Sequence, residues 1–82
     1  MIITVRLMGL NMSPDTSNFT LELNDGATVE HALKKLVAVS DIQWTVEDLT
    51  TYVMLLQSKR ASKNDILKDN DTLIVLKTLE GG

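Results

Sequence analysis

The chain has 82 residues, of which 44% are hydrophobic and 23% are charged, and its formal net charge is -3 at pH 7. These values are typical of one globular domain and argue against disorder and against nucleic-acid binding. The absence of cysteine excludes disulfides, thiolate metal sites and cysteine nucleophiles. Neither a signal-like N-terminal segment nor an apolar stretch of the roughly 20 residues that span a bilayer is present, so we expect a cytoplasmic protein that does not bind membranes.

The first part of the chain predicts an antiparallel pair of strands. In residues 2–8 every second residue is apolar, which is typical of a strand with one buried face, formed here by Ile3, Val5 and Leu7. Residues 9–18 are rich in glycine, asparagine, serine and aspartate and predict a loop. Residues 19–23 alternate again and predict the second strand.

The clearest local signal is a helix that begins after Thr28. Asn24-Asp25-Gly26 predicts a turn, and Thr28 is a good helix N-cap with Glu30 in the first turn. Apolar residues then recur at helical spacing to about Val39, namely Val29, Ala32, Leu33, Leu36 and Val37.

The middle of the chain carries weaker signals. Residues 45–48 resemble a capping box with aspartate in place of glutamate, which indicates a short second helix. Residues 52–56 predict a third strand, and the polar residues 57–64 predict a turn. Trp44 is either a core residue beneath the short helix or an exposed partner contact, and we favour the core.

Residues 72–79 predict the last strand, which follows a turn at residues 67–71. The strand contains the unbroken apolar run Leu73-Ile74-Val75-Leu76, and such a run is typical of a strand covered on both faces. One helix covers only one face of a sheet. The sequence leaves open whether Leu73 and Val75, or Ile74 and Leu76, face that helix.

His31 and a group of aspartates are weak candidates for a site. His31 is the one histidine of the sequence, and no orienting partner lies near it along the chain. Asp65, Asp69 and Asp71 lack the glycine and the distal glutamate of an EF-hand loop, so we expect a solvated turn and no metal site.

The sequence ends in Gly81-Gly82, a pair that arises by chance about once in 200 chains. Gly9 and Gly26 have turn explanations, whereas no element follows the last pair. A frayed terminus accepts any residue. A terminus that enters the catalytic site of a partner favours residues without Cβ, because the backbone can then approach closely. We therefore expect a chemical role for the carboxylate of Gly82.

Together these segments resemble the ubiquitin-like (β-grasp) sulfur carriers, which include the small subunit of molybdopterin synthase and the thiamine-pathway sulfur carrier. Residues 23–29, residues 67–71 and Gly81-Gly82 carry the resemblance, although Asn70 replaces the usual glycine and residues 77–80 lack the proline or serine common there. The resemblance implies an α+β fold with a mixed four- to five-stranded sheet and one main helix, in the order ββαβ(short α)β. Residues 1–78 would form the domain and residues 79–82 a flexible tail.

The resemblance also implies a carrier protein that is not itself an enzyme and binds no cofactor or metal. An E1-like partner would use ATP to adenylate Gly82, and a sulfur donor would convert the adenylate to a thiocarboxylate. The acceptor would be the large subunit of molybdopterin synthase, in molybdenum or tungsten cofactor biosynthesis, or an equivalent. The expected partner contacts are Leu73, Val75, Leu79, Glu80 and Gly81. The alternatives are a protein modifier conjugated through Gly82, a thiamine-type carrier and a plain β-grasp interaction module.

Overall fold

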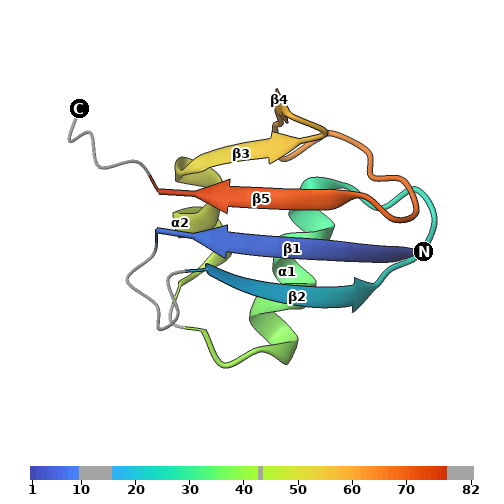
Figure 1. The fold of residues 1–82 in the computed structure, drawn as a ribbon. Helices are drawn as coiled ribbons and strands as arrows, with labels where there is room; N and C mark the ends of the chain where they lie inside the picture. The colour runs from blue at the N-terminus through green and yellow to red at the C-terminus, as the bar shows by residue number, and fades with distance from the viewer. Residues whose placement is uncertain (10–15, 43, 78–82) are drawn as a thin grey trace.

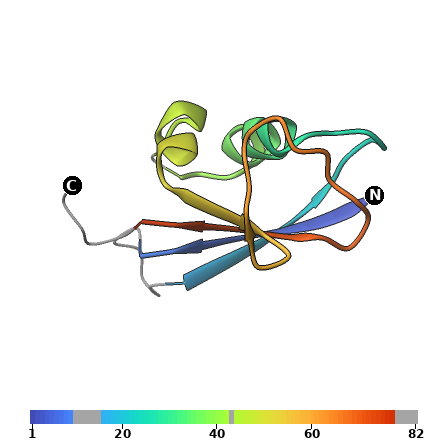
Figure 2. The ribbon, with the colours of Figure 1, turned by 90° about the horizontal axis from the view of Figure 1, so that it is seen from above.

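The computed structural model describes residues 1–9, 16–42 and 44–77. These residues form one five-stranded sheet with two helices packed on one face, as Figures 1 and 2 show from two directions. In chain order the elements are β1 (Ile2–Met8), β2 (Thr16–Glu22), α1 (Val29–Val39), α2 (Val46–Thr51), β3 (Val53–Leu56), β4 (Lys59–Arg60) and β5 (Thr72–Leu76). The α+β class, the mixed sheet and the main helix are thus confirmed.

The last strand lies in the middle of the sheet, whose order is β2-β1-β5-β3-β4. Strand β5 pairs in parallel with β1 and antiparallel with β3, while β2 and β4 occupy the two edges. Within the apolar run of β5, Leu73 and Val75 are fully buried beneath the helices, whereas Ile74 and Leu76 are half-buried on the other face.

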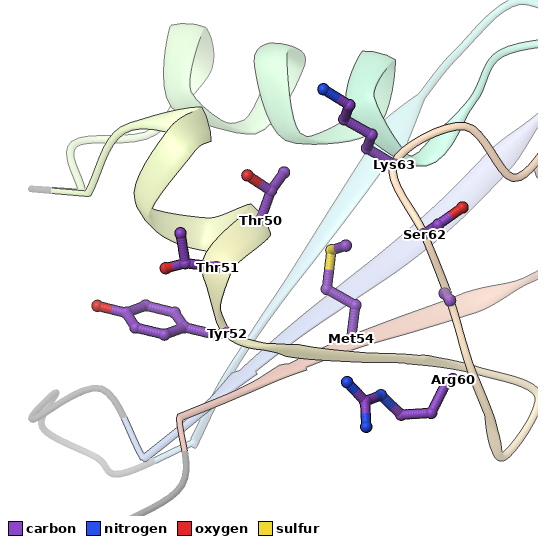
Figure 3. Close-up of a pocket in the computed structure, with 8 residues that line it drawn as sticks. Thr50, Thr51, Tyr52, Met54, Arg60, Ser62 and Lys63 are labelled. Atoms are coloured by element: carbon purple, nitrogen blue, oxygen red, sulfur yellow. The ribbon is translucent and has the colours of Figure 1, made fainter. Parts of the chain in front are cut away.

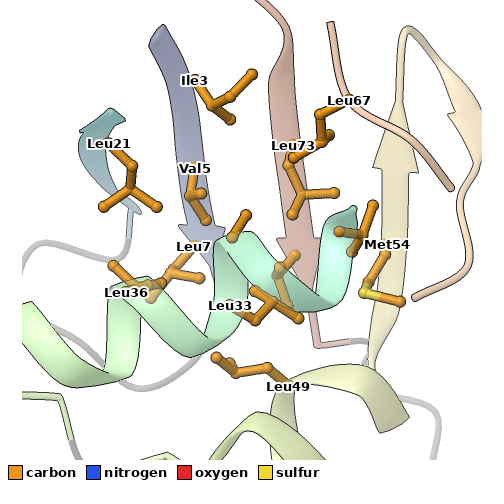
Figure 4. Close-up of a cluster of buried hydrophobic side chains, with 13 residues drawn as sticks. Ile3, Val5, Leu7, Leu21, Leu33, Leu36, Leu49, Met54, Leu67 and Leu73 are labelled. Carbon is orange, nitrogen blue, oxygen red and sulfur yellow. The ribbon is translucent and has the colours of Figure 1, made fainter. Parts of the chain in front are cut away.

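The hydrophobic core lies between the sheet and the two helices (Figure 4). Strands β1, β2, β3 and β5 contribute alternate residues, because successive side chains of a strand point to opposite faces. The predicted helix face is buried at Val29, Ala32, Leu33 and Leu36, and Trp44 is half-buried against the same core, as favoured. The fully buried strand residues are Ile3, Val5, Leu7, Leu73 and Val75.

Reciprocal hydrogen bonds cap both helices at their N-termini. Thr28 Oγ1 accepts from the His31 amide at 3.3 Å, and His31 Nδ1 accepts from the Thr28 amide at 3.0 Å. Thr45 and Asp48 form the same box with two bonds of 3.1 Å. Both predicted starts are confirmed, since these bonds satisfy amides that the helix itself leaves without acceptors.

The position of the short helix differs from the implied order. Helix α2 precedes β3, where the Thr45 box begins it, and does not lie between the third and the last strand. The residues after β3 form a two-residue turn and the short strand β4, which was predicted only as a polar turn. Gln57 and Ser58 make this turn with φ values of 54° and 67°, the left-handed geometry that fits the twist of a tight hairpin.

Two predicted boundaries also move. Strand β2 begins at Thr16 and not at Phe19, because polar residues at its start still pair with the end of β1. Strand β5 ends at Leu76, so Lys77 follows the strand and is not part of it. Residues 78 and 79 of the predicted strand lie outside the described residues, as does the expected boundary between domain and tail.

Candidate functional site

The face of the sheet opposite the helices is the strongest candidate for a binding surface. Figure 2 shows both helices on one side, and no described element covers the other. Apolar side chains gather on this open face around β5, and each is half-buried by its neighbours. We call them the apolar strip: Met8 of β1, Val53 and Leu55 of β3, and Ile74 and Leu76 of β5.

The pairing register places the strip in two adjoining rows. Met8 lies beside Leu76 and Leu76 beside Val53 in one row, and Ile74 lies beside Leu55 in the other. Directly opposed residues share one face of a sheet and contact each other, so the five side chains form one continuous apolar surface.

An arginine lies on each side of the strip. Arg6 is beside Ile74 on β1, and Arg60 is beside Leu55 on β4. Three strand spacings separate the two backbones, a distance of about 14 Å. The Arg6 Nε donates to Asn18 Oδ1 at 3.0 Å, and both arginines are exposed. The open face therefore has an apolar centre between two positive charges.

The structure separates the predicted site residues into two groups. Leu73 and Val75, which we expected to contact a partner, are completely buried against the helices, and the alternative pair Ile74 and Leu76 takes the open face. The other predicted residues, Leu79, Glu80, Gly81 and Gly82, lie outside the described residues. Sequence reasoning missed Arg6 and Arg60, although the alternation of residues 2–8 already placed Arg6 opposite the core.

The end of β5 connects this face to the last residues of the sequence. Lys77, the last described residue, donates its backbone N–H to the Met8 carbonyl at 3.2 Å. Met8 and Leu76, both in the strip, are the nearest neighbours of this point along the two strands. Whatever follows Lys77 therefore begins beside the apolar strip.

A shallow hollow of about 420 Å³ lies between the end of α2 and the chain after β4 (Figure 3). The hydroxyls of Thr50 and Thr51 donate to helix carbonyls at 3.0 and 2.7 Å, so both serve the end of α2. Its other lining residues are Tyr52, Met54, Arg60, Ala61, Ser62 and Lys63. None of the lining side chains is a carboxylate or an imidazole, so the hollow holds no acid–base pair for catalysis.

The weak candidates of the sequence have structural roles. His31 caps α1, as described above. Asp65 and Asp69 accept backbone amides at 2.9 and 2.7 Å, and the buried Asp71 accepts from Gln57 Nε2 at 3.0 Å and from the Lys68 amide at 2.8 Å. Among the described residues no three acidic or histidine side chains are grouped as metal ligands. Neither described helix is long and apolar enough to cross a membrane.

Comparison with known structures gives the fold its name. SAMP1 from Haloferax volcanii superposes with a TM-score of 0.68 at 16% identity, with all of both chains covered. A ubiquitin-like protein from the hyperthermophilic archaeon Caldiarchaeum subterraneum superposes with a TM-score of 0.55 at 15% identity, over 99% of this chain and all of the other. The chain has the ubiquitin-like β-grasp fold.

At the level of sequence, no family profile and no curated protein matches the chain. The β-grasp resemblance read from residues 23–29 and 67–71 is confirmed by the fold. Both segments are turns that lead into core elements, α1 and β5 respectively. The likeness is therefore one of fold.

Proposed function

We propose that this chain is a sulfur carrier whose working group is the carboxylate of Gly82. An E1-like partner adenylates that carboxylate: its oxygen attacks the α-phosphate of ATP and pyrophosphate leaves. A sulfur donor then attacks the acyl carbon, AMP leaves, and the product is a thiocarboxylate. The chain supplies the substrate group and the docking surface, and its partners perform the catalysis.

The observation that carries the proposal is the combination of a β-grasp fold with a diglycine that follows a central strand closely. Five residues after Lys77 the sequence reaches Gly82. An extended chain of this length spans at most about 17 Å, so a partner that binds the apolar strip could also receive Gly82. Ile74 and Leu76 replace Leu73 and Val75 as the proposed partner contacts on β5, together with Leu79, Glu80 and Gly81.

The proposed acceptor is the large subunit of molybdopterin synthase, in molybdenum or tungsten cofactor biosynthesis, with a thiamine-type acceptor as the alternative within the same chemistry. The chain itself would hold neither a metal nor a resident cofactor, and ATP would be used by the activating partner in the cytoplasm.

A second candidate function is a protein modifier joined through Gly82 to lysines of target proteins. Its support is the likeness to an archaeal protein described as ubiquitin-like. Both functions begin with the same adenylate, so they differ only in the nucleophile that attacks it. A plain β-grasp interaction module, the third reading, would not need Gly82 at all.

Intact mass spectrometry of the chain from its native host, without a C-terminal tag, tests the proposal. We expect a population in which one oxygen at Gly82 is exchanged for sulfur. Branched peptides that join Gly82 to lysine would identify the modifier instead. A chain recovered only as the free acid, even after incubation with host extract, ATP and sulfide, would contradict both functions and leave the interaction module.

A further inference from the structure

The backbone at the end of β5 is held in place by the residue that follows β1. Lys77 continues the parallel pairing by one hydrogen bond, from its N–H to the Met8 carbonyl. Gly9, which follows Met8 in the chain, has a φ of +69°. A Cβ at this position would lie 3.0 Å from the Lys77 carbonyl oxygen. Only a residue without Cβ lets the two backbones approach this closely without displacement.

The side chain of Lys77 contacts a different part of the fold, the ring of Tyr52. Its ammonium lies 5.9 Å from the centre of the Tyr52 ring, within the range of a cation–π contact. Tyr52 in turn donates its N–H to the Leu49 carbonyl at 3.3 Å, which ties the ring to the junction of α2 and β3. Two separate parts of the fold therefore meet at Lys77.

We propose that Gly9, Tyr52 and Lys77 form an exit clamp that fixes the backbone of Lys77 and thereby presents Gly82 to the adenylating partner. This inference rests on the proposed function. Five residues follow Lys77 in the sequence up to Gly82, so the position of Lys77 sets where that segment begins. Activation requires the carboxylate oxygen near the α-phosphate in a defined orientation, and misplacement by about 1 Å can cost roughly 100-fold in rate.

Gly26 offers a matched control for Gly9. It also has a positive φ, +88°, but a Cβ there would meet no atom within 4 Å. Asparagine accepts left-handed backbone geometry better than most residues. Both variants, G9N and G26N, therefore place asparagine at a positive φ, and only G9N places a Cβ against Lys77.

Hydrogen exchange of the Lys77 amide, measured by NMR on the purified variants, tests the clamp without any partner. We expect exchange in G9N to be roughly fivefold faster than in G26N, because the bond to Met8 opens locally. The amides of the core strands should be equally protected in both variants. Equal exchange at Lys77 in the two variants would overturn the clamp.

The fraction of chains modified at Gly82 in the native host tests the presentation. We expect G26N to match the wild type and G9N to fall roughly tenfold below it. Equal modification of G9N and G26N, with the wild type modified, would overturn the inference while the proposed function stands. If even the wild type is unmodified, the proposed function fails, and the role of the clamp in presenting Gly82 fails with it. The hydrogen-exchange comparison of G9N and G26N alone then decides whether the clamp exists.

Variants of Lys77 provide a second test of the clamp, one that leaves Gly9 unchanged. Arginine also stacks on aromatic rings, whereas alanine removes the contact with Tyr52. We expect K77R to keep most of the modification at Gly82 and K77A to lose several-fold. Equal loss in both variants would show that the cation–π contact has no part in presentation.

Discussion

Single residues carry much of the order at the turn before β5. Asp71 is 93% buried and accepts two hydrogen bonds, from the Gln57 side chain and from the Lys68 amide, and so joins the β3–β4 hairpin to the turn before β5. We expect Asp71→Ala to lower the free energy of unfolding by about 1–2 kcal/mol, because two partly buried hydrogen bonds to this carboxylate are lost. Urea denaturation measures the loss.

Asp69→Ala is the control for this prediction. The exposed Asp69 accepts one bond, from the Ile2 amide at 2.7 Å, and that amide can turn to water when the carboxylate is removed. The loss should therefore be clearly smaller. A loss in Asp71→Ala no greater than that in Asp69→Ala would show that burial of the Asp71 carboxylate does not stabilise the fold.

Ser58 is held in a backbone geometry that suits glycine. Its φ of 67° lies in the left-handed region, where a Cβ is strained. We expect Ser58→Gly to raise the unfolding free energy by roughly 0.5–1 kcal/mol, measured as an upward shift of several degrees in the thermal midpoint. Ser62→Gly should give no such gain, because Ser62 has no positive φ. A gain in both variants would show that relief of the left-handed geometry at Ser58 is not the cause, because added glycine by itself favours the unfolded chain.

At the scale of single elements, the N-cap hydrogen bond of α1 can be tested by single substitutions at Thr28. Thr28→Ala removes the acceptor for the His31 amide, and we expect a loss of about 1 kcal/mol in urea denaturation. Thr28→Ser keeps the hydroxyl and should stay close to the wild type. A similar loss in Thr28→Ser would assign the effect to the methyl group rather than to the cap.

Strand β5 offers two neighbouring residues with opposite surroundings. Leu73 is fully buried, and we expect Leu73→Ala to cost about 2–4 kcal/mol because it leaves a cavity. Ile74 is half-buried on the open face, so Ile74→Ala should cost about 1 kcal/mol or less and should instead lower modification at Gly82. Denaturation and intact mass measure the two effects. Full modification of Ile74→Ala would exclude the apolar strip as the docking surface.

Leu73 and Ile74 show which part of the fold could not be predicted from the sequence. Strand β1 alternates apolar and polar residues, so its buried face was predictable from residues 2–8 alone. Strand β5 is apolar on both faces, so its pattern carries no information about direction, and only the pairing of Leu73 with the buried Val5 decides it. The positions of Arg6 and Arg60 beside the strip depend on the same long-range register, which no local pattern contains.

The helices and the β3–β4 hairpin also differ in how far local sequence predicts them. The starts of α1 and α2 were predictable because a capping box is a local motif, four residues long, with its own hydrogen bonds. The strand β4 was not, because Gln57-Ser58 lacks the Asn-Gly signature of a tight turn, and two charged residues do not show strand periodicity. The hydrogen bond from the Gln57 side chain to Asp71 stabilises this turn, although the turn sequence itself does not favour it.

At the scale of the whole molecule, positive charge is present on both faces of the sheet, which allows a matched test of docking. Arg6 and Arg60 flank the apolar strip, whereas Lys34 and Lys35 lie exposed on α1, on the helix side. Partners with a complementary acidic rim associate faster, so we expect the double variant R6E/R60E to lower modification at Gly82 several-fold. The variant K34E/K35E makes the same change in net charge. Equal loss in both would show an effect of net charge only.

The order of the sheet, with β5 between β1 and β3, has a consequence for biosynthesis. During translation β1, β2 and β3 leave the ribosome before the strand that joins them, so an unfinished chain exposes two unpaired strand edges and an open core. Strands β1 and β3 can pair with β5 only after residue 76 is released from the ribosome. A chain truncated before that strand therefore lacks both the docking face and the group to be activated. The closure of the sheet and the proposed chemistry at Gly82 thus depend on the same last segment of this sequence.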